Sequence, residues 1–194
     1  MKVLVLYVHP WEKSFNHQLL EKVVEVLKEG KHEMDVLDLN RENFDPILSR
    51  EDLALYNKGK STDPKVAVYQ EKLQWAEHLV LIFPVWWTGE PAILKGFFDK
   101  VLLKGFAFEK VGKMPKGLLG HIKGASVLTT MSSPCFYYSL FLKSPVKQSV
   151  IKGTLKFCGM KKVKWYPLFR IDKLSKARAE QYLARVAKAM REIS

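Results

Sequence analysis

The apolar run at residues 79–85 constrains the fold of this chain more than any other feature. It ends in two tryptophans, Trp86 and Trp87, and an amphipathic helical pattern begins at Pro91 after a short turn. Such a run is typical of a parallel strand buried on both faces, and proline suits the first turn of a helix. Because ligands of open α/β sheets bind outside the carboxyl ends of the strands, the two indole rings predict the wall of a pocket for a flat aromatic ligand.

Strand-like and helix-like patterns alternate along the whole chain. We expect strands at residues 2–8, 33–39, 79–85, 125–131 and 162–168. We expect helices at 16–29, 65–76, 91–103, within 138–157 and at 174–193, and a Gly- and Lys-rich loop at 104–123. Since helical connections favour parallel pairing, the pattern predicts an α/β, flavodoxin-like three-layer sandwich. It forms a single domain over 1–194, and its five-stranded parallel sheet has the order 2-1-3-4-5.

The connection at residues 40–63 is long for such a fold. Connections between strands and helices in compact domains usually have about 4–6 residues. The extra length predicts a loop that contributes to ligand binding or to a dimer contact.

The chain is strongly basic, with a formal net charge of +12 over 194 residues. Its lysines are spread along the sequence, and the densest group, at residues 161–164, falls at an expected strand. No nucleic-acid-binding motif accompanies them, so we expect no nucleic-acid partner. Attraction of an anionic cofactor and general solubility are the favoured meanings of the charge.

Cysteine content and hydropathy place the chain among cytoplasmic proteins. Its two cysteines, Cys135 and Cys158, are too few for a disulfide framework or a zinc site, so we expect reduced thiols and no metal. No apolar run approaches the roughly 18–20 residues of a membrane span, and the first residues lack the pattern of a cleaved signal peptide. Membrane association is therefore not expected.

Three loops at the carboxyl ends of expected strands can form one site. In the first, His9 precedes Ser14 and Asn16, which can cap the next helix and place its N–H groups for a phosphate; the alternative is an ordinary capped turn. The tryptophans of the second loop can flank a ring, or can be core or dimer-interface aromatics. In the third, residues 129–138 offer hydroxyl and N–H groups, or form only a Ser/Pro turn. Together the loops predict a nucleotide or flavin site.

Several segments of the chain resemble one family of enzymes. They are His9 with residues 14–16, residues 43–50, 83–87 with Gly89, 91–96, 105–108, Thr129-Thr130 and 157–159. In these segments the chain resembles the NAD(P)H:quinone oxidoreductase family, flavodoxin-like enzymes related to DT-diaphorase and to the bacterial modulator-of-drug-activity proteins. The resemblance extends to about Gly159, and the Pro-Ala-Ile-Leu-Lys-Gly segment at 91–96 is its most specific part.

The resemblance implies a homodimer with two flavin sites at the subunit interface. NADPH or NADH would deliver a hydride to flavin N5, and a quinone or similar acceptor would then take it in a ping-pong reaction. FAD is the expected flavin and FMN the alternative. Trp87, together with Phe108 of the partner subunit, would form the substrate pocket. The implied cofactor-binding residues are His9, Ser14, Phe15, Asn16, Pro84, Val85, Trp86, Trp87, Thr88, Thr129, Thr130 and Ser132.

The chain departs from the family pattern in two places. The family sequence Thr-Thr-Gly-Gly is replaced by Thr129-Thr130-Met131-Ser132. Either Tyr137 or Tyr138 matches the tyrosine to which the family assigns a catalytic role, but the histidine that follows it has no counterpart, since the last histidine here is His121. Hydride transfer itself depends mainly on the flavin.

Two other functions are compatible with these patterns. One is an electron-carrier flavodoxin, which is disfavoured because the first loop lacks a Thr/Ser-x-Thr-Gly phosphate cradle and because the chain is basic. The other is a flavin-binding regulatory subunit of a membrane transport system, for which the positive surface would serve docking to the transporter.

Overall fold

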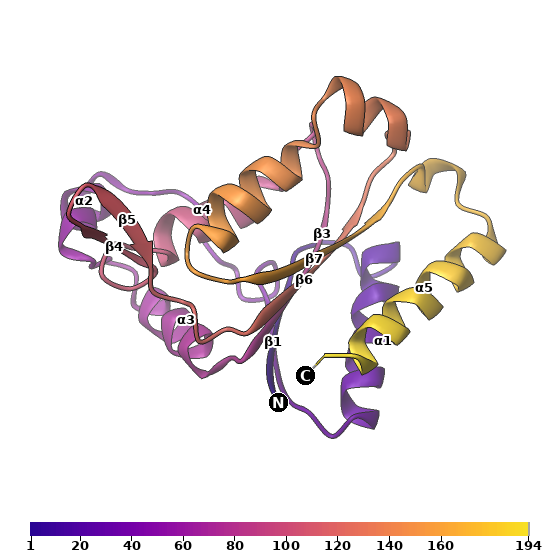
Figure 1. Ribbon diagram of the computed structural model, residues 1–194, viewed down its shortest axis with the longest axis horizontal. Helices are drawn as coiled ribbons and strands as arrows, with labels where there is room; N and C mark the ends of the chain where they lie inside the picture. Colours follow the sequence, from indigo (N-terminus) through magenta and orange to yellow (C-terminus); the bar gives the residue numbers. More distant parts are fainter. Residues whose placement is uncertain (194) are drawn as a thin grey trace.

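The computed structural model describes residues 1–193, and its centre is a five-stranded parallel sheet (Figure 1). The strands are β1 (Lys2–Tyr7), β2 (Glu33–Asp38), β3 (His78–Pro84), β6 (Gly124–Thr130) and β7 (Lys162–Leu168). They lie in the order β2-β1-β3-β6-β7. This confirms the predicted order, since β2, β1, β3, β6 and β7 are the second, first, third, fourth and fifth expected strands.

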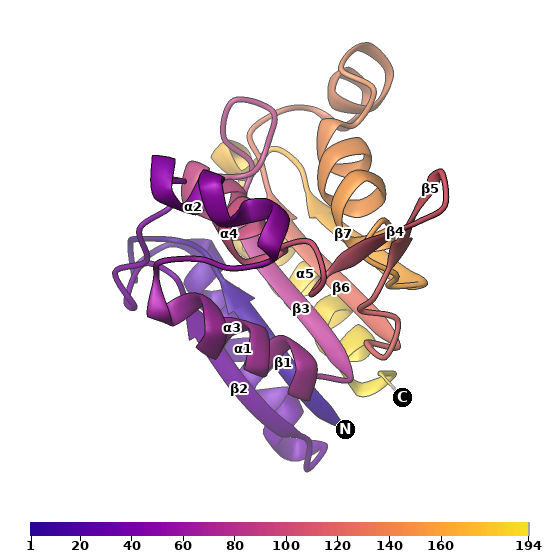
Figure 2. The same ribbon diagram turned by 90° about the vertical axis from the view of Figure 1, so that its left-hand side faces the viewer.

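Two layers of helices cover the sheet. On one face lie α1 (Phe15–Glu29) and α5 (Lys176–Arg191); on the other lie α3 (Pro64–Trp75), α4 (Ala92–Val101) and η3 (Lys147–Lys156) (Figures 1 and 2). Alternate residues of β1 serve the two faces: Val3 and Val5 pack with α1 and α5, whereas Leu4 and Leu6 pack with the other layer. Every residue of β3 and β6 is buried, which explains the apolar run of β3 from Leu79 onward, whereas β6 also buries the hydroxyls of Ser126, Thr129 and Thr130.

Two connections hold structure that the sequence did not predict. The expected loop at 104–123 contains an antiparallel hairpin, β4 (Phe108–Val111) with β5 (Met114–Gly117), so that expectation was wrong. The connection at 40–63 contains α2 (Arg50–Leu55) followed by the turn η1 (Tyr56–Lys58). The buried carboxylate of Asp52 organises this connection by accepting hydrogen bonds from Ser61, Thr62 and Ser49, and these bonds hold its pKa far below the ordinary value in spite of burial.

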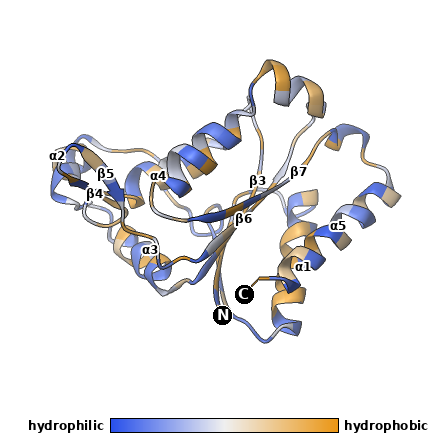
Figure 3. Ribbon diagram, in the orientation of Figure 1, coloured by the Kyte–Doolittle hydropathy of each residue, from blue (hydrophilic) through white to orange (hydrophobic). Residues whose placement is uncertain are grey.

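The helix expected within 138–157 is divided into two wide π-type segments, η2 (Tyr137–Phe141) and η3. Figure 1 shows η2 standing beyond the sheet at the top of the view, and Figure 3 colours this end largely hydrophobic. Leu140 and Phe141 are 73% and 69% exposed. An exposed apolar helical turn of this kind is typical of a contact surface. A further short turn, η4 (Ile171–Lys173), joins β7 to α5.

The position of α4 is fixed by close contact with the segment before α2. A Cβ atom at Gly96 would lie 2.3 Å from the Pro46 carbonyl oxygen, so only glycine allows this approach. The buried Lys100 ammonium donates to the Asp45 carbonyl at 2.9 Å and pairs with Asp63 at 3.3 Å. Two segments that carry the family resemblance, residues 43–46 and 91–96, therefore pack on each other. Their contact sets where α4 begins, immediately after the loop with the tryptophans.

Across residues 1–193, no helix is both long enough and apolar enough to cross a membrane. Within the same residues, no three His, Cys, Asp or Glu side chains are grouped so that they could hold a metal ion.

Candidate functional site

A cavity of about 290 Å³ opens at the carboxyl ends of β1, β3 and β6. The three loops that follow these strands form most of its wall, as the sequence predicted for this edge of the sheet. Nine of the expected cofactor-binding residues lie in the wall, and four further residues complete it. The expected residues are His9, Ser14, Phe15, Asn16, Pro84, Val85, Trp86, Thr130 and Ser132; the others are Trp11, Lys13, Met131 and Ile171.

The loop between β1 and α1 brings a helix N-terminus to this cavity. Ser14 is the N-cap residue of α1, and its hydroxyl oxygen accepts a hydrogen bond from the His17 N–H at 3.2 Å. The N–H groups of the first helical residues, Phe15 and Asn16, have no backbone or side-chain acceptor in the part of the chain that the structure describes. These N–H groups and the helix dipole favour an anion at this point.

Asn16 carries the most informative atom of the cavity. Its side-chain N–H donates to Thr130 Oγ1 at 2.9 Å, which ties α1 to the end of β6. The Asn16 side chain is only 4% exposed, and its Oδ1 has no hydrogen-bond partner among residues 1–193. A buried acceptor without a partner costs about 1–3 kcal/mol. A ligand that donates a hydrogen bond to this oxygen would recover that free energy.

His9 lies between the β1–α1 loop and Trp86. Its Nδ1 accepts a hydrogen bond from the Trp11 N–H at 3.1 Å. Its ring packs edge-on against the Trp86 indole, with 6.1 Å between the ring centroids. Burial lowers the pKa of His9, so the ring is neutral near pH 7. Because Nδ1 accepts, the proton of the neutral ring resides on Nε2, which makes Nε2–H a hydrogen-bond donor.

The loop after β3 contains a strained turn. The backbone groups of Trp86 and Gly89 exchange hydrogen bonds of 3.0 and 3.1 Å, and the two residues between them, Trp87 and Thr88, have φ angles of 47° and 70°. This is the geometry of a type I′ turn, which normally takes Asn-Gly or Gly-Gly at these positions. Non-glycine residues held in this region cost about 1–3 kcal/mol each, and such strain is characteristic of functional sites.

Tyr138 stabilises the strained turn from η2. Its hydroxyl donates to the Thr88 carbonyl oxygen at 2.7 Å and accepts from the Val146 N–H at 3.2 Å. Burial raises the pKa of Tyr138, so its hydroxyl remains protonated and can keep both bonds. The residue is fully buried. Its hydroxyl therefore braces the loop that carries the tryptophans.

We expect Tyr138→Phe to lower the free energy of unfolding by about 1–3 kcal/mol, because the buried Val146 N–H loses its acceptor. Chemical denaturation monitored by circular dichroism measures this change. The neighbouring Tyr137→Phe is the matched control and should change stability by less than about 0.5 kcal/mol, because Tyr137 is 46% exposed. Equal losses in the two variants would contradict the bracing role.

The other expected site residues lie outside this cavity. Trp87 is 98% exposed and Thr88 lies in the turn beside it. Thr129 points to the opposite face of the sheet, where its Oγ1 accepts from Trp165 Nε1 at 3.0 Å, because successive residues of a strand face opposite sides. Phe108 lies at the start of β4, where its ring packs 5.4 Å from that of Phe157. Tyr137 stacks on Phe141, and Tyr138 is in the core.

The four wall residues that were not predicted differ in whether the sequence could have identified them as part of the site. Trp11, Lys13 and Met131 belong to loops that the sequence singles out, so they could have been included. Ile171 comes from η4, and nothing in the sequence marks it as part of a site. It is placed there because its N–H donates to the Met131 carbonyl at 3.0 Å.

Comparison with known proteins places the chain in a family. The family model described as "Flavodoxin-like fold" matches residues 1–193. The ribosyldihydronicotinamide dehydrogenase (quinone) of Mus musculus is 31% identical, with the match covering 99% of this chain and 91% of the mouse protein. The NAD(P)H dehydrogenase (quinone) 1 of Cavia porcellus is 32% identical, but the match covers 81% of this chain and 64% of the relative, so the chain spans just under two thirds of that protein.

A solved structure agrees with these relatives over the whole chain. The NAD(P)H:quinone oxidoreductase from Methanothermobacter marburgensis superimposes with a TM-score of 0.88 at 30% identity, covering 100% of this chain and 99% of the other. The match extends beyond the segments that carry the resemblance in the sequence. The chain therefore belongs to the flavodoxin-like fold family and, within it, to the NAD(P)H:quinone oxidoreductases.

Proposed function

We propose that the protein is a flavin-dependent oxidoreductase that uses NADPH or NADH to reduce quinones or related acceptors. The observation that carries this proposal is the unpartnered Oδ1 of buried Asn16, which lies in a cavity beside the open N-terminus of α1. The names of the relatives support the reductant and the acceptor class. The two reduced cysteines and the use of NAD(P)H support a cytoplasmic location.

The residues of the cavity fit a flavin. The N–H groups of Phe15 and Asn16 suit its phosphate groups, and Asn16 Oδ1 suits a hydroxyl of its sugar-like chain. Residues 84–86 form an edge of the cavity against which a flat ring would lie, and Trp86 would shield one side of that ring from water. A bound flavin would supply the hydride chemistry, accepting from the nicotinamide at N5 and donating to the quinone in turn. The contribution of the chain is to hold and orient these groups and to exclude water.

A second cavity supports FAD over FMN. It measures about 520 Å³ and is lined by three arginines, Arg170, Arg178 and Arg185. Two contacts connect this cavity to the first one. The Met131 N–H of the first cavity donates to the Leu168 carbonyl of the second at 2.9 Å. Tyr182 of the second cavity packs on Phe15 of the first, with 6.1 Å between the ring centroids. Positive charge and space beside the helix N-terminus suit the second phosphate and the adenosine of FAD. FMN would leave this second cavity unused.

The cofactor itself provides the direct test. The purified protein should show the absorption bands of an oxidised flavin, or regain them on incubation with FAD, and chromatography of the released cofactor separates FAD from FMN. Oxidation of NAD(P)H should then require a quinone. Failure to bind either flavin would overturn the proposal, whereas flavin binding without quinone-dependent turnover would favour an electron carrier or a regulatory subunit.

We expect Trp87 to act in the site rather than in the core. Because its side chain is 98% exposed, Trp87→Ala should change the free energy of unfolding of the apoprotein by less than about 0.5 kcal/mol. Loss of a large aromatic surface at the site should raise the quinone KM or the flavin Kd several-fold. Trp165→Ala is the control, since this partly buried indole should lose stability when truncated. A destabilised Trp87→Ala apoprotein with normal kinetics would contradict the assignment.

We also propose a two-fold dimer in which Phe108 reaches the partner's site. The large exposed apolar residues Trp87, Leu140 and Phe141 support such a contact. Of the two candidate tyrosines, the half-exposed Tyr137 suits contact with the substrate, because the Tyr138 hydroxyl is bonded to the backbone.

Mixing Phe108→Ala with Trp87→Ala should raise activity above that of either unmixed variant. After subunit exchange, each heterodimer has one site free of both substitutions, because an isologous contact gives each subunit the same role. Activity measured before and after exchange, beside the unmixed variants, checks this expectation. A fully active monomer in analytical ultracentrifugation would overturn the dimer proposal.

A further inference from the structure

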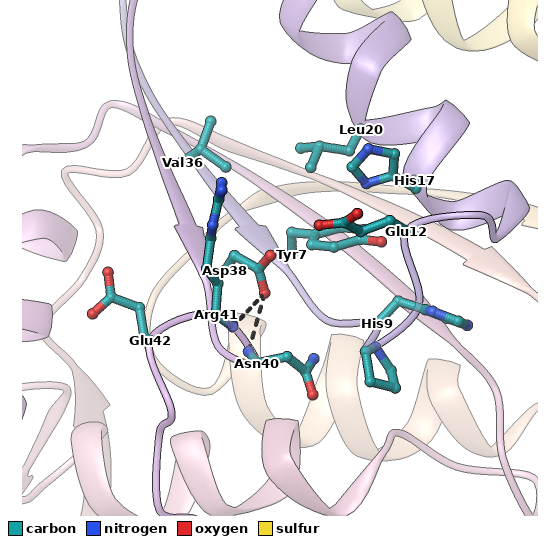
Figure 4. A pocket seen from close by; sticks show the side chains of 11 residues that line it. Tyr7, His9, Glu12, His17, Leu20, Val36, Asp38, Asn40, Arg41 and Glu42 are labelled. Carbon is teal, nitrogen blue, oxygen red and sulfur yellow. Dashed lines mark hydrogen bonds between the residues drawn. The ribbon is translucent and has the colours of Figure 1, made fainter.

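A larger cavity lies on the other side of the β1–α1 loop. It measures about 720 Å³, more than twice the volume of the 290 Å³ cavity, and falls within the roughly 300–1,000 Å³ of small-molecule sites. Its wall comes from the end of β1, the start of α1 and the end of β2 with the turn that follows (Figure 4). The proposed function uses only His9 of this wall.

The charge of this wall is opposite to that of the protein. Glu12, Asp38 and Glu42 contribute three carboxylates, against the single guanidinium of Arg41. The neutral His9 adds no positive charge. In a chain of net charge +12, this is a local acidic site. Figure 4 shows the Asp38 carboxylate held by hydrogen bonds, which it accepts from the N–H groups of Asn40 and Arg41 at 3.0 and 3.2 Å.

A buried hydroxyl gives independent evidence of a ligand. Tyr7 lines the cavity and is only 1% exposed, and its hydroxyl makes no hydrogen bond of good geometry within residues 1–193, although the nearby Ser14 hydroxyl offsets part of the rise that burial causes in the Tyr7 pKa. Figure 4 shows its ring extending between the β1–α1 loop and α1, beside Glu12 and His17. Native proteins rarely leave such groups unpaired, so a polar ligand is the natural partner.

We propose that this cavity binds a small organic amine. Separate ammonium groups of the ligand would meet the carboxylates of Glu12, Asp38 and Glu42, which stand apart along the wall (Figure 4), and one ligand N–H would donate to the Tyr7 hydroxyl. The side chains of Leu20 and Val36 offer an apolar surface for its carbon skeleton. An organic cation fits better than a metal ion, because no cluster of ligating side chains is found in the described part of the chain.

Spermidine is the probe, and isothermal titration with the full chain is the measurement. We expect saturable binding with a stoichiometry of one per chain, which weakens with added salt. Glu12→Gln/Glu42→Gln should raise the spermidine Kd at least about tenfold, and Tyr7→Phe should raise it several-fold without changing the net charge. The double variant Glu71→Gln/Glu180→Gln makes the same charge change at exposed positions of α3 and α5 and should bind normally.

Three outcomes would overturn the proposal. The first is the absence of saturable binding at millimolar spermidine. The second is an equal loss of affinity in the two glutamine pairs, which would mean attraction by overall charge. The third is equal binding of a neutral diol of similar length, which would remove the requirement for a cation. Circular dichroism of each variant shows whether it is folded, so that unfolding is not mistaken for a loss of binding.

Discussion

Asn16→Leu is expected to yield a folded protein that no longer retains flavin. The substitution removes the unpartnered Oδ1 from the cavity wall and replaces it with an apolar group. Loss of a hydrogen bond to a buried ligand group costs about 1–3 kcal/mol, so the flavin Kd should rise by about 5- to 150-fold. Fluorescence titration of the apoprotein with FAD measures this change, and chromatography of the purified variant should find little bound cofactor.

Thr130→Val distinguishes the contact between Asn16 and the flavin from the hydrogen bond by which Thr130 positions the Asn16 side chain. This variant removes the 2.9 Å hydrogen bond that holds the Asn16 amide, but leaves Oδ1 in the chain, so its flavin Kd should rise less than that of Asn16→Leu. Asn57→Leu, at an exposed position, is the matched control and should bind normally. A folded Asn16→Leu variant with an unchanged flavin Kd would exclude this cavity as the flavin site. Should Asn16→Leu fail to fold, unchanged binding in Thr130→Val would argue against the role of Asn16.

The sheet and its order were predictable because burial leaves a strong local signature. Every residue of β3 is buried and its sequence is apolar after His78, and the helical patterns between strands left parallel pairing as the natural arrangement. The hairpin of β4 and β5 gave no such signal, because most of its residues are exposed. Its position depends instead on a tertiary contact: a Cβ at Gly117 would lie 2.2 Å from the Cys158 carbonyl carbon.

The position of a cavity at this edge of the sheet could be predicted, but not the orientation of each residue around it. The edge of the sheet followed from the rule that ligands bind at strand ends. Thr129 and Thr130 were expected to act together, although adjacent strand residues face opposite sides, and only Thr130 meets Asn16. The turn at Trp87 and Thr88 could not be foreseen, because neither residue favours positive φ. It is held by Tyr138, which lies 50 residues further along the chain from Thr88.

Gly96→Val is expected to cause the largest loss of stability among these variants. Helix propensity alone would favour replacing a glycine inside α4, because alanine raises the stability of a helix interior by about 1 kcal/mol relative to glycine. The packing opposes this, since an added Cβ would lie 2.3 to 2.5 Å from three atoms of Pro46, two of them in the backbone. The Pro46 segment cannot easily move away, because Phe44 is in the core and Lys100 holds the Asp45 carbonyl. Overpacking costs about 1–3 kcal/mol, and the branched valine belongs at or above the upper end of that range.

Chemical denaturation should therefore rank Gly96→Val as less stable than Gly96→Ala, and both as less stable than the parent protein. Gly89→Ala is the control, because a Cβ at Gly89 meets nothing within 4 Å and stability should change by less than about 0.5 kcal/mol. A more stable Gly96→Ala protein would show that propensity prevails and that the contact with Pro46 relaxes. Because α4 begins directly after the turn at Trp86, the Gly96 variants should also lose flavin affinity. The flavin Kd should rise in parallel with the loss of stability if the contact with Pro46 positions that loop.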